Sequence, residues 1–286
     1  MAIADCFREG HTVFSCEIFP PKKEGPISTV YETLEGLSQL RPDFISVTYG
    51  AGGGPGAGTA TVEIAAMVRR YGIQPLAHIT CMGAARQQTA ALLDRLAGAG
   101  VDSVLALRGD RTPGPPPVSD FPHASDLTAF IRSGWDLSVS GACYPEGHFE
   151  SESLVEDTLN LRKKVEAGAG HLISQLFFDN SAFYAFVERA RIAGIGVPIQ
   201  AGIMPVVNRR QIERMVSLCG ASLPPKFARM ISRYGDNPQA MRDAGIAYAI
   251  DQIVDLVANG VQGIHLYTMN NPQVARRIYD SVQSLL

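Results

Sequence analysis

A glutamate near the amino terminus is the residue best suited to acid–base chemistry. Glu17 lies in the otherwise apolar segment VFSCEIF, and the rigid pair Pro20-Pro21 follows that segment. A carboxyl group buried among apolar side chains has a raised pKa, because burial penalises its charged form. Such a group holds a proton near neutral pH and can deliver it as a general acid. The alternative is a structural glutamate that pairs with an arginine or an amide inside the fold.

Other polar residues follow apolar runs elsewhere in the chain. Asp110 comes directly after the run SVLALRG and is a second candidate carboxylate, with a helix cap or a loop carboxylate as the alternative. His78, His148 and His265 are either active-site or structural histidines. Their wide spacing does not match a metal-binding motif, so we predict no metal site.

Two lysines share a predicted helix with an acid and an amide. Lys163 and Lys164 come about one turn after Asp157 and Asn160, so the four side chains can share a face. Lysines on a helix are usually solvated, and the alternative is a site for an anionic ligand.

The glycine-rich motifs of nucleotide-binding folds are absent. Neither GxGxxG after a strand nor GxxxxGK[ST] occurs, and GAGGG at 50–54 precedes the next helix by several residues. We therefore expect any flavin or nicotinamide to be bound by strand-end residues and not by a Rossmann unit.

The elements that must position these residues alternate along the chain. Apolar runs predict strands at 13–19, 43–48, 75–80, 103–108, 137–143, 171–177, 197–203 and 263–268. Amphipathic segments predict helices at 27–40, 59–72, 86–99, 124–134, 153–169, 181–194, 208–219, 224–259 and 272–284.

The turns between these elements favour one architecture. AGAGVDSV, EAGAGHLI, RIAGIGVPI and VANGVQGIH each place glycine between a helix and a strand, where a left-handed cap is needed. Eight βα units without a long linker predict a closed (β/α)8 TIM barrel of the α/β class, with residues 1–286 as one domain. A doubly wound open sheet is the alternative.

In such a barrel, catalytic groups lie at the carboxyl ends of the strands. Those ends carry Glu17, Thr48, Tyr49, His78, Thr80, Arg108, Gly109, Asp110, Tyr144, Glu146, His148, Gln175, His265, Tyr267 and Asn270. The polar groups therefore gather on one rim, as an active site requires.

Composition narrows the classes of function. The chain has 286 residues, a net charge of −3 and 46% hydrophobic residues. This balance gives no basic surface for nucleic acid or an anionic membrane. The five cysteines are scattered, and the amino terminus lacks the pattern of a signal peptide. We expect a cytoplasmic protein that binds neither nucleic acid nor membrane.

An ordered set of motifs carries a resemblance to a known family. The segments FSCEIFPPK, DFISVTYGAGG, AHITC, ALRGD, ASDL, ACYPEGH, ISQLFFD, AGIMPV and HLYTMN run in unbroken order along nearly the whole chain. In this the sequence closely resembles the bacterial methylenetetrahydrofolate reductases, in a short form that has the catalytic barrel only.

The resemblance implies a chemistry. Family members are (β/α)8 barrels that hold FAD without a covalent bond. They pass a hydride from NADH or NADPH to the flavin, and then to 5,10-methylenetetrahydrofolate, in a ping-pong cycle that yields 5-methyltetrahydrofolate. The matching general acid is Glu17, which would protonate the folate N10, and Asp110 matches an aspartate beside the flavin and the pterin.

The resemblance also implies binding residues. Gln175, Tyr267 and Asn271 would contact the folate, although many members have arginine where this chain has Asn271, and that arginine helps hold the glutamate tail. His123 likewise stands where tyrosine is frequent. The implied FAD-binding residues are Thr48, Tyr49, His78, Thr80, Leu107, Arg108, Gly109, Asp110, His123, Ala124, Asp126, Ala142, Tyr144, His148, Asp157, Asn160, Lys163, Lys164 and Ile173.

Two other functions fit the same sequence. One is a folate-binding barrel without redox chemistry, either a methyltransferase or a lyase that uses Glu17 and Asp110 as an acid–base pair. The other is a reductase subunit that takes its electrons from a partner protein instead of a nicotinamide. Self-association through the outer helices is also possible for a barrel, and the sequence leaves the oligomeric state open.

Overall fold

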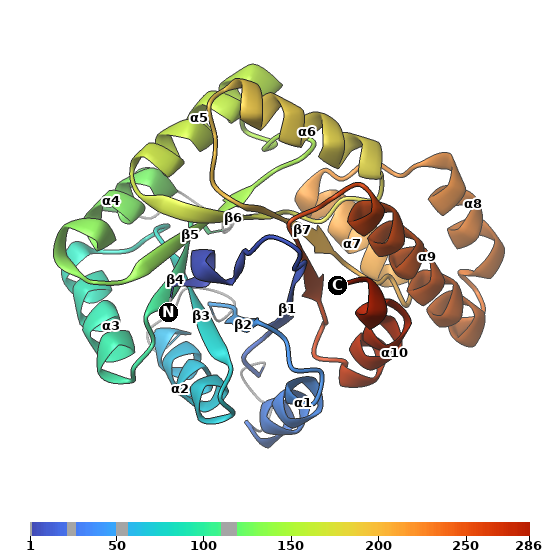
Figure 1. The fold of residues 1–286 in the computed structure, drawn as a ribbon, viewed down its shortest axis with the longest axis horizontal. Coiled ribbons are helices and arrows are strands. Elements are labelled where there is room, and N and C mark those ends of the chain that lie inside the picture. The colour runs from blue at the N-terminus through green and yellow to red at the C-terminus, as the bar shows by residue number, and fades with distance from the viewer. Residues whose placement is uncertain (1, 22–26, 50–56, 110–118) are drawn as a thin grey trace.

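Eight parallel strands close into a barrel in their order along the chain, from β1 to β8, and β8 pairs with β1. The computed structural model describes residues 2–21, 27–49, 57–109 and 119–286. Figure 1 looks into the barrel and shows the helices as an outer ring. The strands are β1 (Val13–Ile18), β2 (Phe44–Val47), β3 (Gln74–Thr80), β4 (Ser103–Leu107), β5 (Ser138–Cys143), β6 (Ala169–Ser174), β7 (Ile199–Ile203) and β8 (Gly263–Tyr267). The predicted (β/α)8 barrel is confirmed, and the open-sheet alternative is wrong.

The helices follow the strands as the sequence predicts, with one exception. They are α1 (Ser28–Ser38), α2 (Ala57–Arg70), α3 (Arg86–Gly98), α4 (Ala124–Gly134), α5 (Leu154–Glu166), α6 (Asn180–Ile192), α7 (Arg209–Cys219), α8 (Pro225–Tyr234), α9 (Pro238–Ala258) and α10 (Pro272–Val282). The segment 224–259, predicted as one helical region, is two helices. Asn237 starts the second by accepting a hydrogen bond from the Ala240 amide, and Pro238 occupies its first turn.

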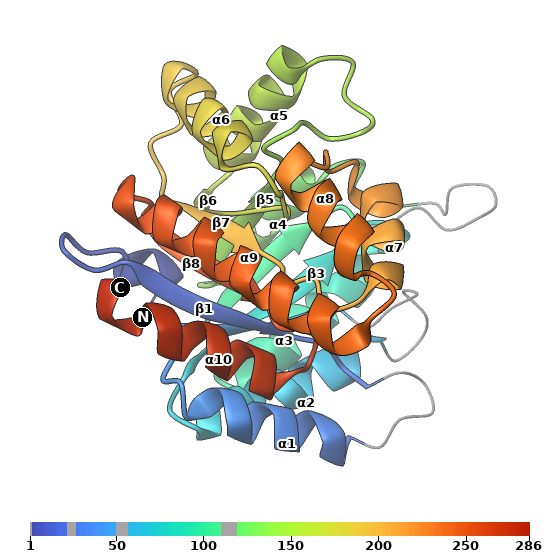
Figure 2. The same cartoon turned by 90° about the vertical axis from the view of Figure 1, so that its right-hand side faces the viewer.

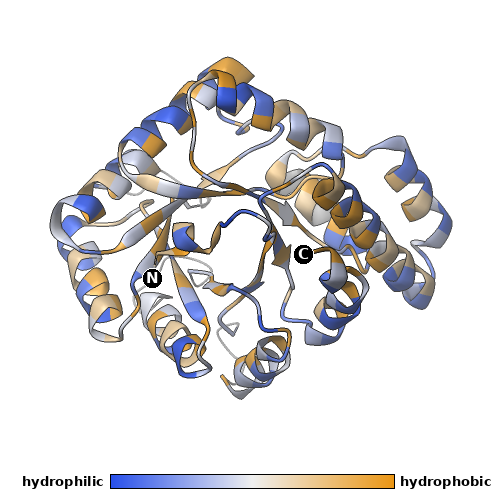
Figure 3. Ribbon diagram, in the orientation of Figure 1, coloured by the Kyte–Doolittle hydropathy of each residue, from blue (hydrophilic) through white to orange (hydrophobic). Residues whose placement is uncertain are grey.

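Strand side chains alternate between two environments. Residues such as Ile45, Ala77 and Val104 point outward into the large core that the strands share with the helices. Phe44 and Leu76 point inward and pack in a separate cluster. Figure 3 shows the corresponding alternation of hydrophobic and hydrophilic residues along the helices that cover the strands. Because the period is two, the inward direction of one residue fixes the direction of its whole strand.

A short 3-10 helix, η1 (Ile3–Cys6), closes the amino end of the barrel. Ile3 is fully buried and packs with Val13 and Phe44 in the inward cluster. The Leu286 carbonyl accepts a hydrogen bond from the Thr12 amide, so both ends of the chain lie at this side of the barrel, as Figure 2 shows. The sequence did not predict this helix, since four residues are too few to show a periodic pattern.

The glycines predicted to end helices have the expected backbone conformation. Gly100, Gly168, Gly194 and Gly260 have φ values between 75° and 117°, which side chains rarely adopt. The prediction of left-handed turns before β4, β6, β7 and β8 is confirmed.

None of the helices in the described part of the chain is long and apolar enough to cross a membrane.

Gly245 allows α9 to approach the backbone after β7. A Cβ built at Gly245 would lie 1.8 Å from the Val206 carbonyl oxygen, so a side chain there requires a backbone shift. We expect Gly245→Ala to lower the free energy of unfolding by about 3 kcal/mol or more, as overpacking against backbone does. Urea unfolding followed by circular dichroism measures the change.

Gly98→Ala in α3 is the matched control, because a Cβ there would meet no atom within 4 Å. It should stabilise the protein by up to about 1 kcal/mol through helix propensity. Equal unfolding midpoints for Gly245→Ala and the unsubstituted protein would show that α9 does not depend on this close approach.

Candidate active site

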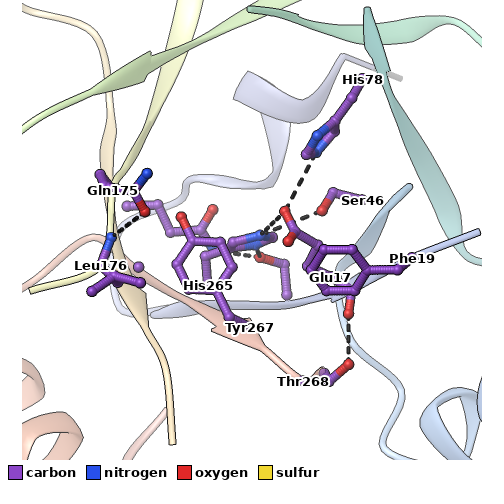
Figure 4. A network of polar contacts seen from close by, with 12 residues as sticks. Glu17, Phe19, Ser46, His78, Gln175, Leu176, His265, Tyr267 and Thr268 are labelled. Atoms are coloured by element: carbon purple, nitrogen blue, oxygen red, sulfur yellow. Dashed lines mark hydrogen bonds and ion pairs between the residues drawn. The ribbon is translucent and has the colours of Figure 1, made fainter. Parts of the chain in front are cut away.

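Glu17 points into the barrel near the carboxyl end of β1. Its side chain is buried, with a residue exposure of 6%. Its Oε2 atom lies 3.6 Å from His78 Nε2 on β3 and 3.7 Å from His265 Nε2 on β8. Ser46 on β2 gives the carboxyl a hydrogen bond. Figure 4 shows the Glu17 carboxyl group pointing at these side chains, which come from β2, β3 and β8.

Burial is the strongest influence on the pKa of this group. It raises the pKa of Glu17, and the opposing effects of His78 and the Ser46 hydrogen bond are smaller. Burial also lowers the pKa of His78 to about 4, so that imidazole is neutral at pH 7. A carboxylic acid beside a neutral imidazole is the state in which neither group carries an uncompensated charge. The geometry therefore favours the proton-donor interpretation of Glu17 over a structural ion pair.

The loop after β8 holds the end of β1 in place. Thr268 Oγ1 donates a hydrogen bond of 2.6 Å to the Glu17 carbonyl. The Asn270 amide accepts from the Phe19 N–H at 2.8 Å and donates to the Phe19 carbonyl at 2.9 Å. Met269 and Asn270 have φ values of 51° and 54°, and asparagine tolerates this conformation well. Thr268 and Asn270, at the end of the HLYTMN motif, therefore fix the backbone that carries Glu17.

Tyr267 lies opposite Glu17 in the register of β8 with β1. Its hydroxyl donates a hydrogen bond of 2.7 Å to the Ser174 carbonyl, which anchors the ring over β6 and β7. Gly202 makes room for it, since a Cβ there would lie 2.7 Å from Tyr267 Cε2. The tyrosine is therefore held rigidly beside the candidate acid.

Gln175 lies where β6 ends. Its backbone N–H donates to the Cys143 carbonyl at 2.7 Å, and its side-chain Oε1 accepts from the Leu176 N–H. It lines a small hollow with Tyr144 and Gly147. The side chain is fixed at the rim, where a ligand can reach it.

The ends of β3 and β4 form a second part of the rim. Their pairing continues past the strands, since the Cys81 N–H donates to the Leu107 carbonyl and the Met82 N–H to the Arg108 carbonyl. Gly109 has a φ of 88°, and a Cβ there would crowd Thr80. A tight glycine turn therefore brings backbone close to the centre of the rim.

Arg108 forms an ion pair with Glu150, which comes from the loop after β5. Its Nε atom is buried without a hydrogen-bond partner among the described residues. A buried donor of this kind has capacity for a ligand.

The loop after β5 and helix α5 form the third part. Tyr144 and His148 make an edge-to-face contact at 4.7 Å, and Phe149, which is 66% exposed, stacks on His148. Asp157 Oδ1 accepts from the His148 N–H and from Ser151 Oγ, which orders this loop.

Lys164 reaches from α5 beneath the same loop. Its Nζ atom donates a hydrogen bond of 2.6 Å to the Ala142 carbonyl. Burial lowers its pKa, and the field of Asp157 partly offsets that effect. An ammonium group has three protons to donate, so Lys164 can hold a further acceptor.

Several predicted site residues have structural contacts. Lys163 is exposed and donates to Asn160 at 3.0 Å. The Asn271 side chain starts α10 by accepting from the Val274 N–H.

Four further predicted residues lie at the start of α4 or inside the barrel, and a fifth, Asp110, is outside the described residues. Asp126 accepts from the His123 N–H at the start of α4, where Ala124 is the first helical residue. Ile173 is 3% exposed in the inward cluster of the barrel. Asp110 lies outside the described residues, so its predicted position beside the ligand stays a prediction.

Sequence reasoning missed a set of polar residues inside the barrel. Ser15, Ser46, Ser140, His171 and Gln200 are all buried. They alternate with outward apolar residues on β1, β2, β5, β6 and β7. Once Glu17 is taken to point inward, the period of two places Ser15 inward as well, and this signal could have identified it.

A cavity near α6 is larger than the hollow at Gln175, but Glu17 does not line it. That cavity, of about 400 Å³, lies between α6 and the turn before β8 and is lined by Phe183, Val187, Ile192 and Val261 among others. It contains none of the polar side chains that surround Glu17. Among the described residues, no group of three or more histidine, cysteine, aspartate or glutamate side chains is arranged to hold a metal ion.

Comparison with known proteins identifies relatives over nearly the whole chain. The family model described as methylenetetrahydrofolate reductase matches residues 2–283. The 5,10-methylenetetrahydrofolate reductase of Escherichia coli strain K12 is 34% identical over 272 residues, which cover 94% of this chain and 90% of the relative. The protein of the same name from Pectobacterium carotovorum is 32% identical over the same shares. Methylenetetrahydrofolate reductase (NADH) 1 of Arabidopsis thaliana is 33% identical over 92% of this chain and 47% of its own length.

Solved structures agree on the fold. An uncharacterized protein from Clostridium thermocellum, described as binding two copies of 5-methyl-5,6,7,8-tetrahydrofolic acid, superposes with a TM-score of 0.72. It is 14% identical, and the match covers 96% of both chains. At this identity the likeness concerns the barrel alone.

The buried histidines predict a loss of stability in acid. Burial lowers the pKa of His171 to about 3, whereas an unfolded histidine titrates near 6.5. Its contribution to stability is therefore complete above about pH 6.5 and is lost as the pH falls toward 3. Between pH 5.5 and 4.5, the free energy of unfolding should fall less steeply with falling pH in His171→Asn than in the unsubstituted protein. The two slopes should differ by about 1.4 kcal/mol per pH unit. Urea unfolding at each pH measures this slope.

His123→Asn is the control, because the His123 side chain is exposed. Its slope should equal that of the unsubstituted protein. If His171→Asn gave that same slope, the assignment of a neutral buried imidazole at His171 would be refuted.

Proposed function

The chain belongs to the methylenetetrahydrofolate reductase family, and from that premise we propose that it reduces 5,10-methylenetetrahydrofolate to 5-methyltetrahydrofolate with a hydride that originates from NADH. The plant relatives named as NADH-dependent support this choice of nicotinamide. Residues 1–286 would act as one catalytic domain.

The buried carboxyl of Glu17 is the observation that carries the proposal. The substrate has a five-membered ring whose methylene carbon bridges N5 and N10. Protonated Glu17 gives its proton to N10 while the bond between N10 and the methylene carbon breaks. The electron pair of that bond goes to N10, and N5 and the methylene carbon share the positive charge as an iminium. Hydride addition to this carbon completes the methyl group, and Glu17 is left as the carboxylate to be reprotonated.

The rim suits a flavin dinucleotide, the group that the family implies. Arg108 Nε is a buried donor without a partner among the described residues, and Lys164 has donors to spare. Gly109 is half-buried in its tight turn and has no side chain that would keep a flat ligand from its backbone. Bound FAD would accept the hydride of NADH and pass it to the folate, which is the chemistry that it supplies.

Each part of the rim would hold a different part of the FAD. Arg108 and Lys164 offer positive charge for the pyrophosphate, and His148 with Tyr144 offers an aromatic surface. The full set proposed for FAD is Thr48, Tyr49, His78, Thr80, Leu107, Arg108, Gly109, Asp110, His123, Ala124, Asp126, Ala142, Tyr144, His148, Asp157, Asn160, Lys163, Lys164 and Ile173. Of these, Lys163, Asn160 and Ile173 have the weakest support, because the first two pair with each other and the third is in the barrel core.

Gln175 and Tyr267 are the residues proposed to contact the pterin and the folate tail. Both lie at strand ends and are held by backbone hydrogen bonds, and Tyr267 is the register partner of Glu17. Asn271 is proposed at the end of the tail, where its part is limited by the helix cap that it makes. Asp110 keeps its proposed place near the positive charge of the iminium, which a carboxylate would stabilise.

Glu17→Gln separates the two half-reactions. In anaerobic stopped-flow experiments the variant should be reduced by NADH within about twofold of the normal rate, because that step needs no proton from Glu17. Oxidation of the reduced enzyme by methylenetetrahydrofolate should slow by about 10²- to 10⁴-fold, the usual contribution of a general acid.

Glu188→Gln, on the exposed face of α6, is the matched carboxylate control and should leave both half-reactions unchanged. A normal rate of folate reduction in Glu17→Gln would remove the acid from the mechanism. Protein purified without flavin and unable to rebind FAD would favour the barrel without redox chemistry. Protein that binds FAD but accepts no hydride from NADH or NADPH would favour the partner-dependent subunit.

A further inference from the structure

A chain of buried polar side chains crosses the inside of the barrel beneath Glu17. Gln200 on β7, Ser15 on β1 and His265 on β8 are each 0% exposed. Gln200 Nε2 donates to Ser15 Oγ at 2.8 Å, and Ser15 Oγ contacts His265 Nδ1 at 2.7 Å. The far nitrogen of His265 faces Ser46 Oγ at 3.3 Å and Glu17 Oε2 at 3.7 Å.

The neighbours of Gln200 fix the direction of this chain. Its Nε2 atom also lies 2.9 Å from the Ile264 carbonyl and 3.4 Å from the Val13 carbonyl. Carbonyl oxygens only accept hydrogen bonds, so this end of the side chain is the amide nitrogen. Ser15 Oγ therefore accepts a hydrogen bond from Gln200, and among the described residues the acceptor within hydrogen-bond distance of its own hydroxyl proton is His265 Nδ1.

This direction selects one tautomer of His265. A neutral imidazole carries one proton, and a nitrogen that accepts from Ser15 cannot hold it. The proton of His265 is therefore on Nε2 and points toward Ser46 and Glu17. Burial lowers the pKa of His265 to about 3, which keeps the ring neutral at pH 7.

A second histidine continues the chain away from the site. The Gln200 side chain faces His171 and raises its pKa slightly, against the larger effect of burial. Neither Gln200 Oε1 nor His171 Nε2 has a partner within hydrogen-bond limits in the described structure. His171 Nδ1 in turn contacts Ser140 Oγ at 3.0 Å.

We propose that Gln200 and Ser15 are positioning residues that hold His265 as the Nε2–H tautomer. In this tautomer the N–H of His265 points toward the Glu17 carboxyl and orients that carboxyl, so that Glu17 can deliver its own proton to the folate. The inference rests on the proposed function, since it concerns the same acid. The groups that face Glu17 are His78 on β3, His265 and Tyr267 on β8 and Ser46 on β2. Only His265 among them is connected to Gln200 through Ser15.

Nitrogen NMR of protein labelled with ¹⁵N-histidine tests the tautomer without reference to activity. The resonances of His265 are identified by comparison with single-histidine variants. We expect a protonated Nε2 and an unprotonated Nδ1 at pH 7 in the unsubstituted protein. A proton on Nδ1 would overturn the proposal even if Gln200→Met failed to fold.

Gln200→Met then tests the effect on the acid. The substitution removes the amide and keeps the length of the side chain. We expect a mixture of His265 tautomers, and an apparent pKa of the folate half-reaction that shifts by about half a unit or more. We also expect a folate half-reaction slower by about tenfold, as is usual when a supporting hydrogen bond to an active-site group is lost. Reduction by NADH should stay within about twofold.

Gln252→Met is the matched control, because Gln252 is another buried glutamine and bonds to the Phe177 carbonyl and Asn180 outside the barrel. It should change stability only. If Gln200→Met slowed both half-reactions equally, or left the tautomer and the pH profile unchanged, the residue would be structural. Failure of the unsubstituted protein to reduce folate would refute the proposed function instead, and the tautomer would still be measured.

Discussion

The structure depends on one constraint, which is the burial of a carboxyl group inside a closed barrel. Removing a carboxylate from water is unfavourable, and Glu17 has no arginine or lysine among its contacts in the described part of the chain. The favourable solution is to keep the proton. Burial raises the pKa of this carboxyl, and a carboxyl that keeps its proton is the reagent that opening of the folate ring would need, so the energetics of the fold and the proposed chemistry have the same origin.

The barrel makes this solution possible because its apolar core, between strands and helices, is separate from its interior. Outward strand residues and the helices form an extensive apolar core, so that the stability of the fold does not depend on the interior of the barrel alone. The interior can then hold serines, histidines and a glutamine, most of which contact one another. Burial lowers the pKa of the histidines for the same reason that it raises the pKa of Glu17, because it penalises the charged form of each group. The hydrogen bonds of Thr268 and Asn270 to β1 add the backbone rigidity that an acid needs to meet its substrate at a fixed position.

The sequence predicts most of the fold because its signals are local and repeated. Apolar runs, amphipathic segments and a glycine after a helix recur along the chain, and the structure follows them within a few residues. The boundary between α8 and α9 depends on Asn237 and Pro238, a cap inside a stretch that otherwise reads as helix. The helix η1 depends on contacts of Ile3 with strands far away in sequence, which no local pattern reveals. The strand ends also identify Glu17, Gln175 and Tyr267, since their types are unusual in apolar segments. The roles of Gln200 and Ser15 follow only from closure of the barrel, which brings β7, β1 and β8 together.

The protonation state of Glu17 at neutral pH is the central claim, and infrared difference spectroscopy tests it most directly. The spectrum of Glu17→Gln is subtracted from that of the unsubstituted protein at pH 7, in the absence of substrate. The account predicts a carbonyl band of a protonated carboxylic acid that is present only in the unsubstituted protein. A difference spectrum that contains only the bands of an ionised carboxylate would contradict it.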